Sequence, residues 1–156
     1  MTPDPDPLLP PGFRPMPAGG DFMKINGPLY LAREGDRVLI GFRVEARHCN
    51  PMGNCHGGML ASFCDMLLPM SAHRKAEAVR NRFLPTINLQ LDYMAPVVLG
   101  AWVQGEAEVL RVTRTMVFAQ GLVTSDGEPA VRVSGIFKLG QNFDPKTFHP
   151  TDAGRA

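Results

Sequence analysis

The stretch that decides the fold of this chain reads His48-Cys49-Asn50-Pro51-Met52-Gly53-Asn54-Cys55-His56-Gly57-Gly58 and continues into the mostly apolar segment from Met59 to Met70. A polar loop marked by glycines is followed here by apolar residues that recur every three or four positions, which predicts a helix. The other face of this helix is also mostly apolar. We therefore expect it to be buried on both sides, one against the chain's own sheet and the other against a partner subunit.

Asp65 is the one acidic residue on this helix. Its neighbours at three and four positions are Ala61, Ser62, Leu68 and Pro69, none of which is a cation. A carboxylate on a buried helix face is costly unless another group satisfies it. Either a partner elsewhere in the chain or solvent does so, or Asp65 is a catalytic base or nucleophile in a dry cleft. Because Pro69 lacks the N–H that would bond the Asp65 carbonyl, we expect the helix to kink or end there.

Gly57 and Gly58 stand at the predicted start of the helix. The first N–H groups of a helix have no partners inside it, and the helix dipole there favours negative charge. Glycine lets a ligand approach this backbone closely, which suits an oxyanion hole that polarises a carbonyl group. The simpler interpretation is that the glycines only form the turn into the helix.

Alternating apolar and polar residues predict strands on both sides of the helix. One pair precedes it, at residues 27–32 and 37–45, and four follow it, at residues 86–94, 101–112, 116–125 and 130–139. Asp126-Gly127 is a hairpin signal between the last two strands. Residues 72–83 are expected to form a charged connection. One antiparallel sheet that covers one helix is an α+β architecture.

Composition narrows the class of protein. A chain of 156 residues is long enough for one domain, and a formal net charge of +1 argues against nucleic acid or an acidic membrane as a partner. No apolar run is long enough to span a bilayer. The three cysteines and the absence of a signal-peptide pattern predict a reduced, cytoplasmic setting. Prolines make residues 1–20 an extended tail that Phe13 and Phe22 could anchor.

Two further groups of residues are candidate ligand sites. His48, Cys49, Cys55 and His56 invite a metal site, but the cysteine spacing does not match common zinc pairs and no second cluster follows, so we expect no metal. Several arginines lie on the late strands or after the helix. They are expected to be either a solvated surface or a site for a phosphate-rich ligand, and Arg82, Arg111 and Arg114 are the candidates.

The segment from Asn50 to Gly58, followed by Asp65, resembles the signature of hot-dog-fold acyl-CoA thioesterases, and in particular their phenylacetate-degradation branch. The resemblance covers residues 27–139 and includes Tyr93-Met94-Ala95-Pro96. It implies a curved antiparallel sheet wrapped around one long helix. It also implies a homodimer or a dimer of dimers, that is a homotetramer, with the active site between subunits. The chain then divides into a tail at 1–22, a hot-dog domain at 23–140 and a polar tail at 141–156.

The resemblance also implies a role for each site residue. The backbone N–H of Gly57 would bind the thioester carbonyl, and the side chains of Asn50 and His56 would help to hold the thioester. Asp65 from the other subunit would act as general base or nucleophile, and the hydroxyl of Thr86 would position the water or the carboxylate. No cofactor is expected apart from coenzyme A as part of the substrate.

The sequence thus predicts an enzyme that hydrolyses acyl-CoA to a carboxylic acid and coenzyme A. The alternative is a non-catalytic hot-dog protein that binds acyl-CoA or a lipid. A hot-dog hydratase is disfavoured because the histidine that follows Asp65 is His73, on a different part of the helix. The acyl group is not predicted, since methionine and aromatic residues could line a pocket for a chain or a ring.

Overall fold

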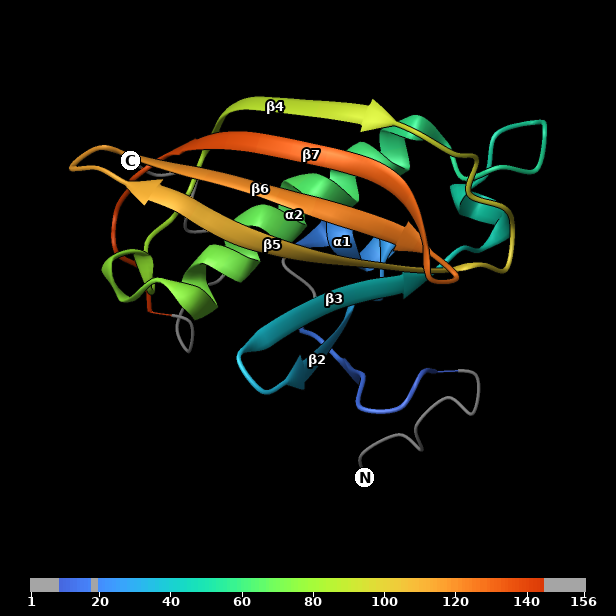
Figure 1. Cartoon of the computed structure of the whole chain (residues 1–156), viewed down its shortest axis with the longest axis horizontal. Helices are drawn as coiled ribbons and strands as arrows, with labels where there is room; N and C mark the ends of the chain where they lie inside the picture. The colour runs from blue at the N-terminus through green and yellow to red at the C-terminus, as the bar shows by residue number, and fades with distance from the viewer. Residues whose placement is uncertain (1–8, 18–19, 145–156) are drawn as a thin grey trace.

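A single antiparallel sheet curves around one long helix in the computed structural model of the chain, which describes residues 9–17 and 20–144 (Figure 1). The seven strands lie in the order β1-β2-β3-β5-β6-β7-β4. The elements are β1 (Arg14–Pro15), α1 (Asp21–Asn26), β2 (Tyr30–Glu34), β3 (Arg37–Arg43), η1 (Ala46–His48), α2 (Gly57–Lys75), η2 (Glu77–Val79), β4 (Thr86–Tyr93), β5 (Trp102–Val112), β6 (Met116–Ser125) and β7 (Glu128–Lys138). The predicted α+β architecture is confirmed.

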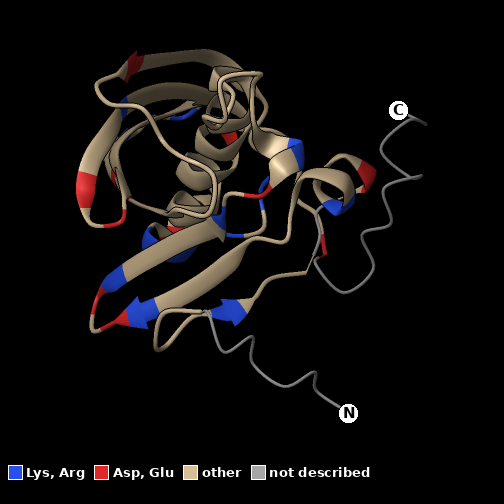
Figure 2. Cartoon of the chain, turned by 90° about the vertical axis from the view of Figure 1, so that its right-hand side faces the viewer, with Lys and Arg blue, Asp and Glu red and all other residues tan. Residues whose placement is uncertain are grey.

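The strands lie where the alternation of apolar and polar residues predicts them, with ends that differ by a few residues. Charged residues gather at the strand ends and loops, and the helix lies within the curve of the sheet (Figure 2). No helix in the described part of the chain is long and apolar enough to cross a bilayer.

Helix α2 is longer than predicted. It does not end one turn after Asp65 but continues past Pro69 to Lys75, so the prediction that a connection begins at residue 72 is wrong. Beyond Pro69 the helix still buries Ser71 and Ala72 against the sheet. Tertiary packing of this kind outweighs the one backbone hydrogen bond that a proline removes.

Two glycines let α2 lie close to the sheet. A Cβ atom at Gly105 of β5 would stand 2.4 Å from Leu67 Cδ2, and one at Gly135 of β7 would stand 2.8 Å from Leu68 Cδ1. Both distances are shorter than carbon atoms tolerate, so glycine is needed at each position. The two leucines are fully buried, and this contact fixes how far α2, and with it Asp65, stands from the strands.

The N-terminal segment adds two elements that the sequence pattern did not predict. Arg14–Pro15 pairs with β2 and extends the sheet, and the ring of Phe13 packs 4.9 Å from that of Trp102. Phe13 therefore anchors this segment, whereas Phe22 is 59% exposed and does not. The short helix α1 follows and buries Met23. Residues 1–8, the start of the predicted tail, lie outside the described residues.

The N-terminal segment also covers part of the outward face of α2. Met16 and Met23 line a cavity together with Met66 and Met70 of α2. Met66 and Met70, which are half-buried, therefore lie beside a segment of their own chain, whereas the expected contact of the opposite face of α2 with a partner subunit stays a prediction. Ala61 and Asp65, on the neighbouring stripe of the helix, remain half-buried.

Strand β4 forms the free edge of the sheet opposite to β1 (Figure 1). Two of its apolar side chains, Ile87 and Tyr93, are 55% and 52% exposed. An edge strand presents unpaired backbone donors and acceptors, which another strand can bind. This edge and the residues that it carries make up one wall of the site described next.

Candidate active site

Asp65 is held by a hydroxyl group rather than by a cation. Thr86 Oγ1 donates a hydrogen bond of 2.6 Å to Asp65 Oδ1. Thr86 is the first residue of β4, and the pairing of β4 with β7 shifts register between Thr86 and Asn88. Such an irregularity changes the direction of a side chain at the end of a strand. Among the described residues no lysine, arginine or histidine forms an ion pair with Asp65.

The N-terminus of α2 leaves one backbone donor unused. His56 caps the helix: its Nδ1 accepts a hydrogen bond of 2.8 Å from Gly58 N, and its carbonyl oxygen accepts one of 2.9 Å from Met59 N. The N–H of Gly57 makes no hydrogen bond within residues 9–17 and 20–144. Because Nδ1 is an acceptor, the ring proton of His56 is on Nε2, which is free to donate. Two donors are therefore available to an acceptor oxygen at this end of the helix.

Tyr93 ties the start of α2 to the end of β4. Its hydroxyl donates a hydrogen bond of 2.7 Å to Gly57 O. Its ring packs against Gly57, so that a Cβ atom added to Gly57 would stand 3.4 Å from Tyr93 Cζ. Burial, more than the neighbouring Cys64 and Cys55, raises the pKa of Tyr93, so the hydroxyl remains a donor at neutral pH. The resemblance includes Tyr93 in its motif but implies no role for its hydroxyl. The contact joins segments 36 residues apart, so no local spacing reveals it.

Asn50 has its side-chain orientation fixed by its own loop. Its Oδ1 accepts hydrogen bonds from Met52 N at 3.0 Å and from Asn54 N at 3.2 Å. With the oxygen used in this way, the Nδ2 group is the free end of the amide, and it has no hydrogen-bond acceptor in the part of the chain that the structure describes. Asn50 can therefore offer a donor beside the start of α2.

His48 and the cysteines have structural positions. The buried ring of His48 accepts a hydrogen bond of 3.0 Å from Glu45 N at Nδ1, and its Nε2 lies 2.9 Å from Asn26 O. Burial lowers the pKa of His48, with nearby Arg47 as a smaller cause. Burial raises the pKa of both Cys55 and Cys64 to about 12, so these thiols stay protonated. No group of three or more metal-ligating side chains occurs among the described residues.

Within one chain the two halves of the predicted site do not meet. Gly57 and Asp65 are eight residues apart on the same helix, which separates them by about 12 Å along its axis. Two turns of helix lie between the free N–H and the carboxylate. A single carbonyl group could not touch both within one copy of the chain.

The three candidate arginines lie toward the other end of α2. Arg111 is near the end of β5 and Arg114 is in the turn between β5 and β6, and both are exposed. That hairpin and the C-terminal end of α2 share one end of the molecule (Figure 1). Arg82 is half-buried, and its Nε donates a hydrogen bond of 2.7 Å to Gly140 O. The structure does not bring these arginines to Gly57 within one chain.

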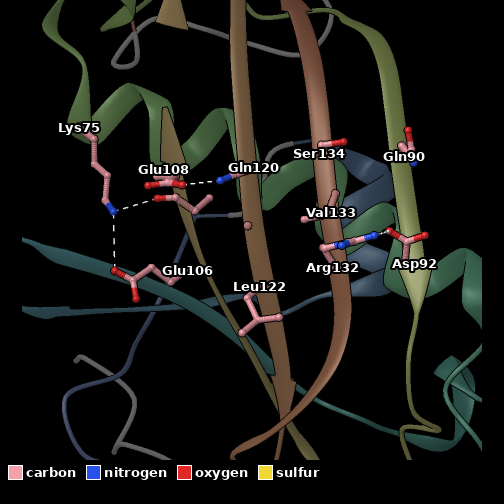
Figure 3. A pocket seen from close by; sticks show the side chains of 12 residues that line it. Lys75, Gln90, Asp92, Glu106, Glu108, Gln120, Leu122, Arg132, Val133 and Ser134 are labelled. Atoms are coloured by element: carbon pink, nitrogen blue, oxygen red, sulfur yellow. Dashed lines mark hydrogen bonds and ion pairs between the residues drawn. The ribbon is translucent and has the colours of Figure 1, made fainter. Parts of the chain in front are cut away.

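A hollow on the outer surface of the sheet lies away from all of these residues. It has a volume of about 650 Å³ and is lined by residues of β4, β5, β6 and β7, most of them polar, and by Lys75 at the end of α2. Figure 3 shows them on the side of the strands turned away from α2, joined by pairs such as Arg132 with Asp92 at 2.9 Å and Gln120 with Glu108 at 2.5 Å. Its charged groups are largely paired, and none of the predicted catalytic residues lines it.

A curved antiparallel sheet around one long helix, with a carboxylate on the helix and a free amide at its start, defines a hot-dog protein of the thioester-hydrolase class. The sequence profile of the Thioesterase superfamily matches residues 52–131. This match covers just over half of the chain, and the chain belongs to this family. The predicted resemblance, hot-dog fold and class of enzyme are thereby confirmed.

Known relatives agree with this assignment. Human acyl-coenzyme A thioesterase 13 is 27% identical over 110 residues, which cover 68% of this chain and 74% of the human protein. The PaaI protein from the phenylacetic acid degradation operon of E. coli superposes with a TM-score of 0.65 at 13% identity, over 80% of this chain and 87% of that one. A hypothetical thioesterase from Streptococcus pneumoniae, solved with coenzyme A, superposes with a TM-score of 0.62 at 20% identity. The superposition covers 78% of this chain and 99% of that one.

Proposed function

We propose that this protein hydrolyses an acyl-CoA thioester to a carboxylic acid and coenzyme A, at a site that two copies of the chain complete together. The observation that carries the proposal is the pair of groups on α2: an unused N–H at Gly57 and a carboxylate at Asp65 that Thr86 orients. A donor for a developing oxyanion and an oriented carboxylate are the groups that ester-type hydrolysis requires.

The second copy is proposed because of the separation of about 12 Å between Gly57 and Asp65 in one chain. Two copies that pair their β4 edges about a twofold axis run antiparallel, and so do the helices behind those strands. Asp65 of one copy then faces Gly57 of the other. The exposed side chains of Ile87 and Tyr93 on β4 are buried by the same pairing. The twofold axis generates two identical sites in each dimer, and a dimer of dimers would hold four.

In the proposed reaction the thioester carbonyl oxygen accepts hydrogen bonds from Gly57 N–H and from the Nε2 of His56 or the Nδ2 of Asn50. Asp65 takes a proton from water as the water oxygen bonds to the carbonyl carbon, and negative charge moves to the oxygen held at the helix start. The carbon–sulfur bond then breaks, coenzyme A leaves as a thiolate, and this thiolate takes up the proton that Asp65 received, which restores the carboxylate. Attack by Asp65 itself, with later hydrolysis of the anhydride, uses the same geometry.

The ligand assignments follow from this arrangement. Coenzyme A enters as part of the substrate and no separate cofactor is required. The coenzyme A in the Streptococcus pneumoniae neighbour supports a thioester of this carrier. Arg111 and Arg114 are proposed to contact its phosphates from a neighbouring subunit, because their guanidinium groups are exposed and arginine suits phosphate oxygens. Arg82, already bonded to Gly140, is the weakest of the three candidates. The cytoplasmic location remains a prediction.

The test is thiol release from a panel of acyl-CoA esters by the wild type and by Asp65→Asn. The amide keeps the size of the carboxylate and can still contact Thr86, but it cannot accept the proton or act as the nucleophile. A fall of about 10²–10⁴ in kcat at unchanged thermal stability is expected. Equal turnover by the two proteins would remove Asp65 from the mechanism. Tight binding of acyl-CoA without any turnover would instead identify a non-catalytic acyl-CoA or lipid-binding protein.

A further inference from the structure

A second cavity lies between the N-terminal segment and the outward face of α2. Its volume is about 270 Å³, and its walls include Met16, Met23, Lys24, Leu29, Met66 and Met70. Four methionines from three separate segments therefore meet around one space. Methionine has a flexible, apolar side chain that adapts to the shape of an apolar ligand.

The cavity reaches the turn of α2 that carries the proposed catalytic carboxylate. Met66 follows Asp65 directly, and Met70 lies one turn further along the same stripe of α2. Adjacent residues on a helix point about 100° apart, so Asp65 and Met66 lie on either side of the stripe that carries Ser62 and Pro69. An acyl chain bonded to a carbonyl carbon at Asp65 would reach Met66 by crossing this stripe of α2.

We propose that this cavity holds the acyl chain of the substrate and selects unbranched, uncharged chains of about eight to ten carbons. The inference rests on the proposed thioesterase activity and names the substrate class of that site. It assigns the acyl pocket to the chain's own N-terminal segment, so that Met16 and Met23 determine specificity without touching the reacting atoms.

The residues that line the cavity determine that the acyl chain it accepts is uncharged. Lys24 is the charged residue among the described side chains that line the cavity, and its Nζ lies 2.7 Å from Asp21 Oδ1. The remaining walls are methionine, proline and leucine side chains. An acyl group with a charge at its far end would lose part of its hydration against these apolar walls, which is unfavourable. The larger hollow on the outside of the sheet is unsuitable for an acyl chain, because paired polar groups line it.

The volume of the cavity limits the length of the acyl chain that it can hold. A cavity of about 150 Å³ holds benzene, which has six carbons, so by proportion about 270 Å³ holds roughly ten. An aryl group such as phenylacetyl would leave much of the space empty. Each methylene that enters an apolar cavity favours binding by about fourfold. The gain per methylene ends where the cavity is full, which gives the chain-length profile a maximum.

The experiment measures kcat/KM for straight-chain acyl-CoA esters from butyryl to palmitoyl, and for phenylacetyl-CoA. For the wild type we expect a rise of up to about fourfold per methylene to a maximum near ten carbons. Met70→Trp fills the far end of the cavity and should move the maximum to shorter chains, with at least a tenfold loss for decanoyl-CoA and little change for butyryl-CoA. Met70→Ala enlarges the cavity and should move the maximum to longer chains.

Ile25→Trp is the matched control, because Ile25 is on α1 beside the cavity-lining Lys24 but is 68% exposed and does not line the cavity. It should keep the wild-type profile. Opposite shifts in the two Met70 variants cannot arise from a general loss of folding. If both variants hydrolyse the series with the wild-type profile, the acyl pocket is elsewhere and the inference is overturned, while the thioesterase activity stands.

A binding measurement separates failure of the inference from failure of the function. S-Decyl-CoA and S-ethyl-CoA are thioethers that cannot be hydrolysed, and calorimetry gives the affinity of each. Preference of the wild type for the decyl compound, lost in Met70→Trp and kept in Ile25→Trp, supports the acyl pocket even if no ester is turned over. Equal affinity for the two compounds overturns it whatever the activity.

Discussion

Thr86 Oγ1 lies 2.6 Å from Asp65 Oδ1, and this contact joins the first residue of the edge strand to the middle of the central helix. At the other end of the same strand, Tyr93 OH lies 2.7 Å from Gly57 O. Strand β4 thus positions the carboxylate with one end and the start of α2 with the other. Both groups of the proposed chemistry depend on the placement of one strand.

Thr86→Ala should lower kcat by about 10- to 150-fold, because a hydrogen bond to a charged group contributes about 1.5–3 kcal/mol and this one fixes the orientation of Asp65. KM should change little, since Thr86 is not proposed to bind coenzyme A. Thr86→Ser keeps the hydroxyl and should retain most of the activity. Steady-state kinetics on a single acyl-CoA check this, and equal rates for the serine and alanine variants would contradict it.

Gly57→Pro removes the proposed oxyanion donor while preserving the helix. Proline is favoured at the first position of a helix, and the preceding His56 already has φ −61° and ψ 137°, the extended region that a residue before proline prefers. Loss of one oxyanion donor should lower kcat by about 10²–10³-fold. The free energy of unfolding should stay within about 1 kcal/mol of the wild type, because the missing N–H has no partner in the described chain.

Gly57→Ala is the control for that variant, since it adds a side-chain carbon but keeps the N–H. The new Cβ would make ordinary contact with the Tyr93 ring at 3.4 Å. We expect a smaller loss of kcat than for the proline variant, at equal or slightly higher thermal stability. A proline variant as active as the alanine variant would show that the Gly57 amide does not polarise the carbonyl.

Mixed dimers test whether the site spans two subunits. Asp65→Asn and Gly57→Pro should each be inactive as homodimers. Random exchange of subunits makes half of the dimers mixed, and each mixed dimer has one site with both wild-type residues, so about a quarter of wild-type activity should return. The measurement is thiol release after the two proteins are mixed, partly unfolded together and refolded. No recovery, although native mass spectrometry detects mixed dimers, would place the site within one chain.

Buried His48 and half-buried His73 should make the stability depend on pH. Burial lowers the pKa of His48 and of His73 in the folded protein below the ordinary value of 6.5. Below pH 6.5 the unfolded chain takes up protons that the folded chain does not. The free energy of unfolding should therefore fall as pH decreases from 7, by at most about 1.4 kcal/mol per pH unit for each histidine.

Urea unfolding between pH 7.5 and 5.5 measures this slope. His73 Nε2 lies 2.7 Å from Arg82 O, and His73→Gln can replace that donor without titrating. The glutamine variant should show a shallower dependence than the wild type. Parallel curves for the two proteins would show that His73 keeps its ordinary pKa in the folded state.

The sequence predicts strands β2 to β7 and the start of α2 because these parts of the fold are locally encoded. The alternation of apolar and polar residues from Thr86 to Tyr93 marks a strand, and the glycines at 57 and 58 mark the start of α2. The length of α2 could not be predicted past Pro69. Local propensity favours a break at that proline, whereas the helix is held by burial of Ser71 and Ala72 against strands far away in the sequence.

The site was only partly predictable for the same reason. The individual residues Asp65, Gly57 and Asn50 stand out by type and position, but their contacts join distant segments. Tyr93 and Gly57 are 36 residues apart. The N-terminal segment was expected to be an extended tail, since its prolines oppose regular structure. Its contribution to the methionine cavity depends on the contact of Phe13 with Trp102, which no spacing in the sequence reveals.

That contact gives the protein a built-in optical reporter. Trp102 is the only tryptophan in the chain, and its indole ring lies 4.9 Å from Phe13 and 5.7 Å from Tyr30. It is 6% exposed and donates from Nε1 to Gln104. Release of the N-terminal segment would expose the indole to water and move its fluorescence emission to longer wavelength. Opening of the wall that carries Met16 can therefore be followed in real time in the unlabelled protein.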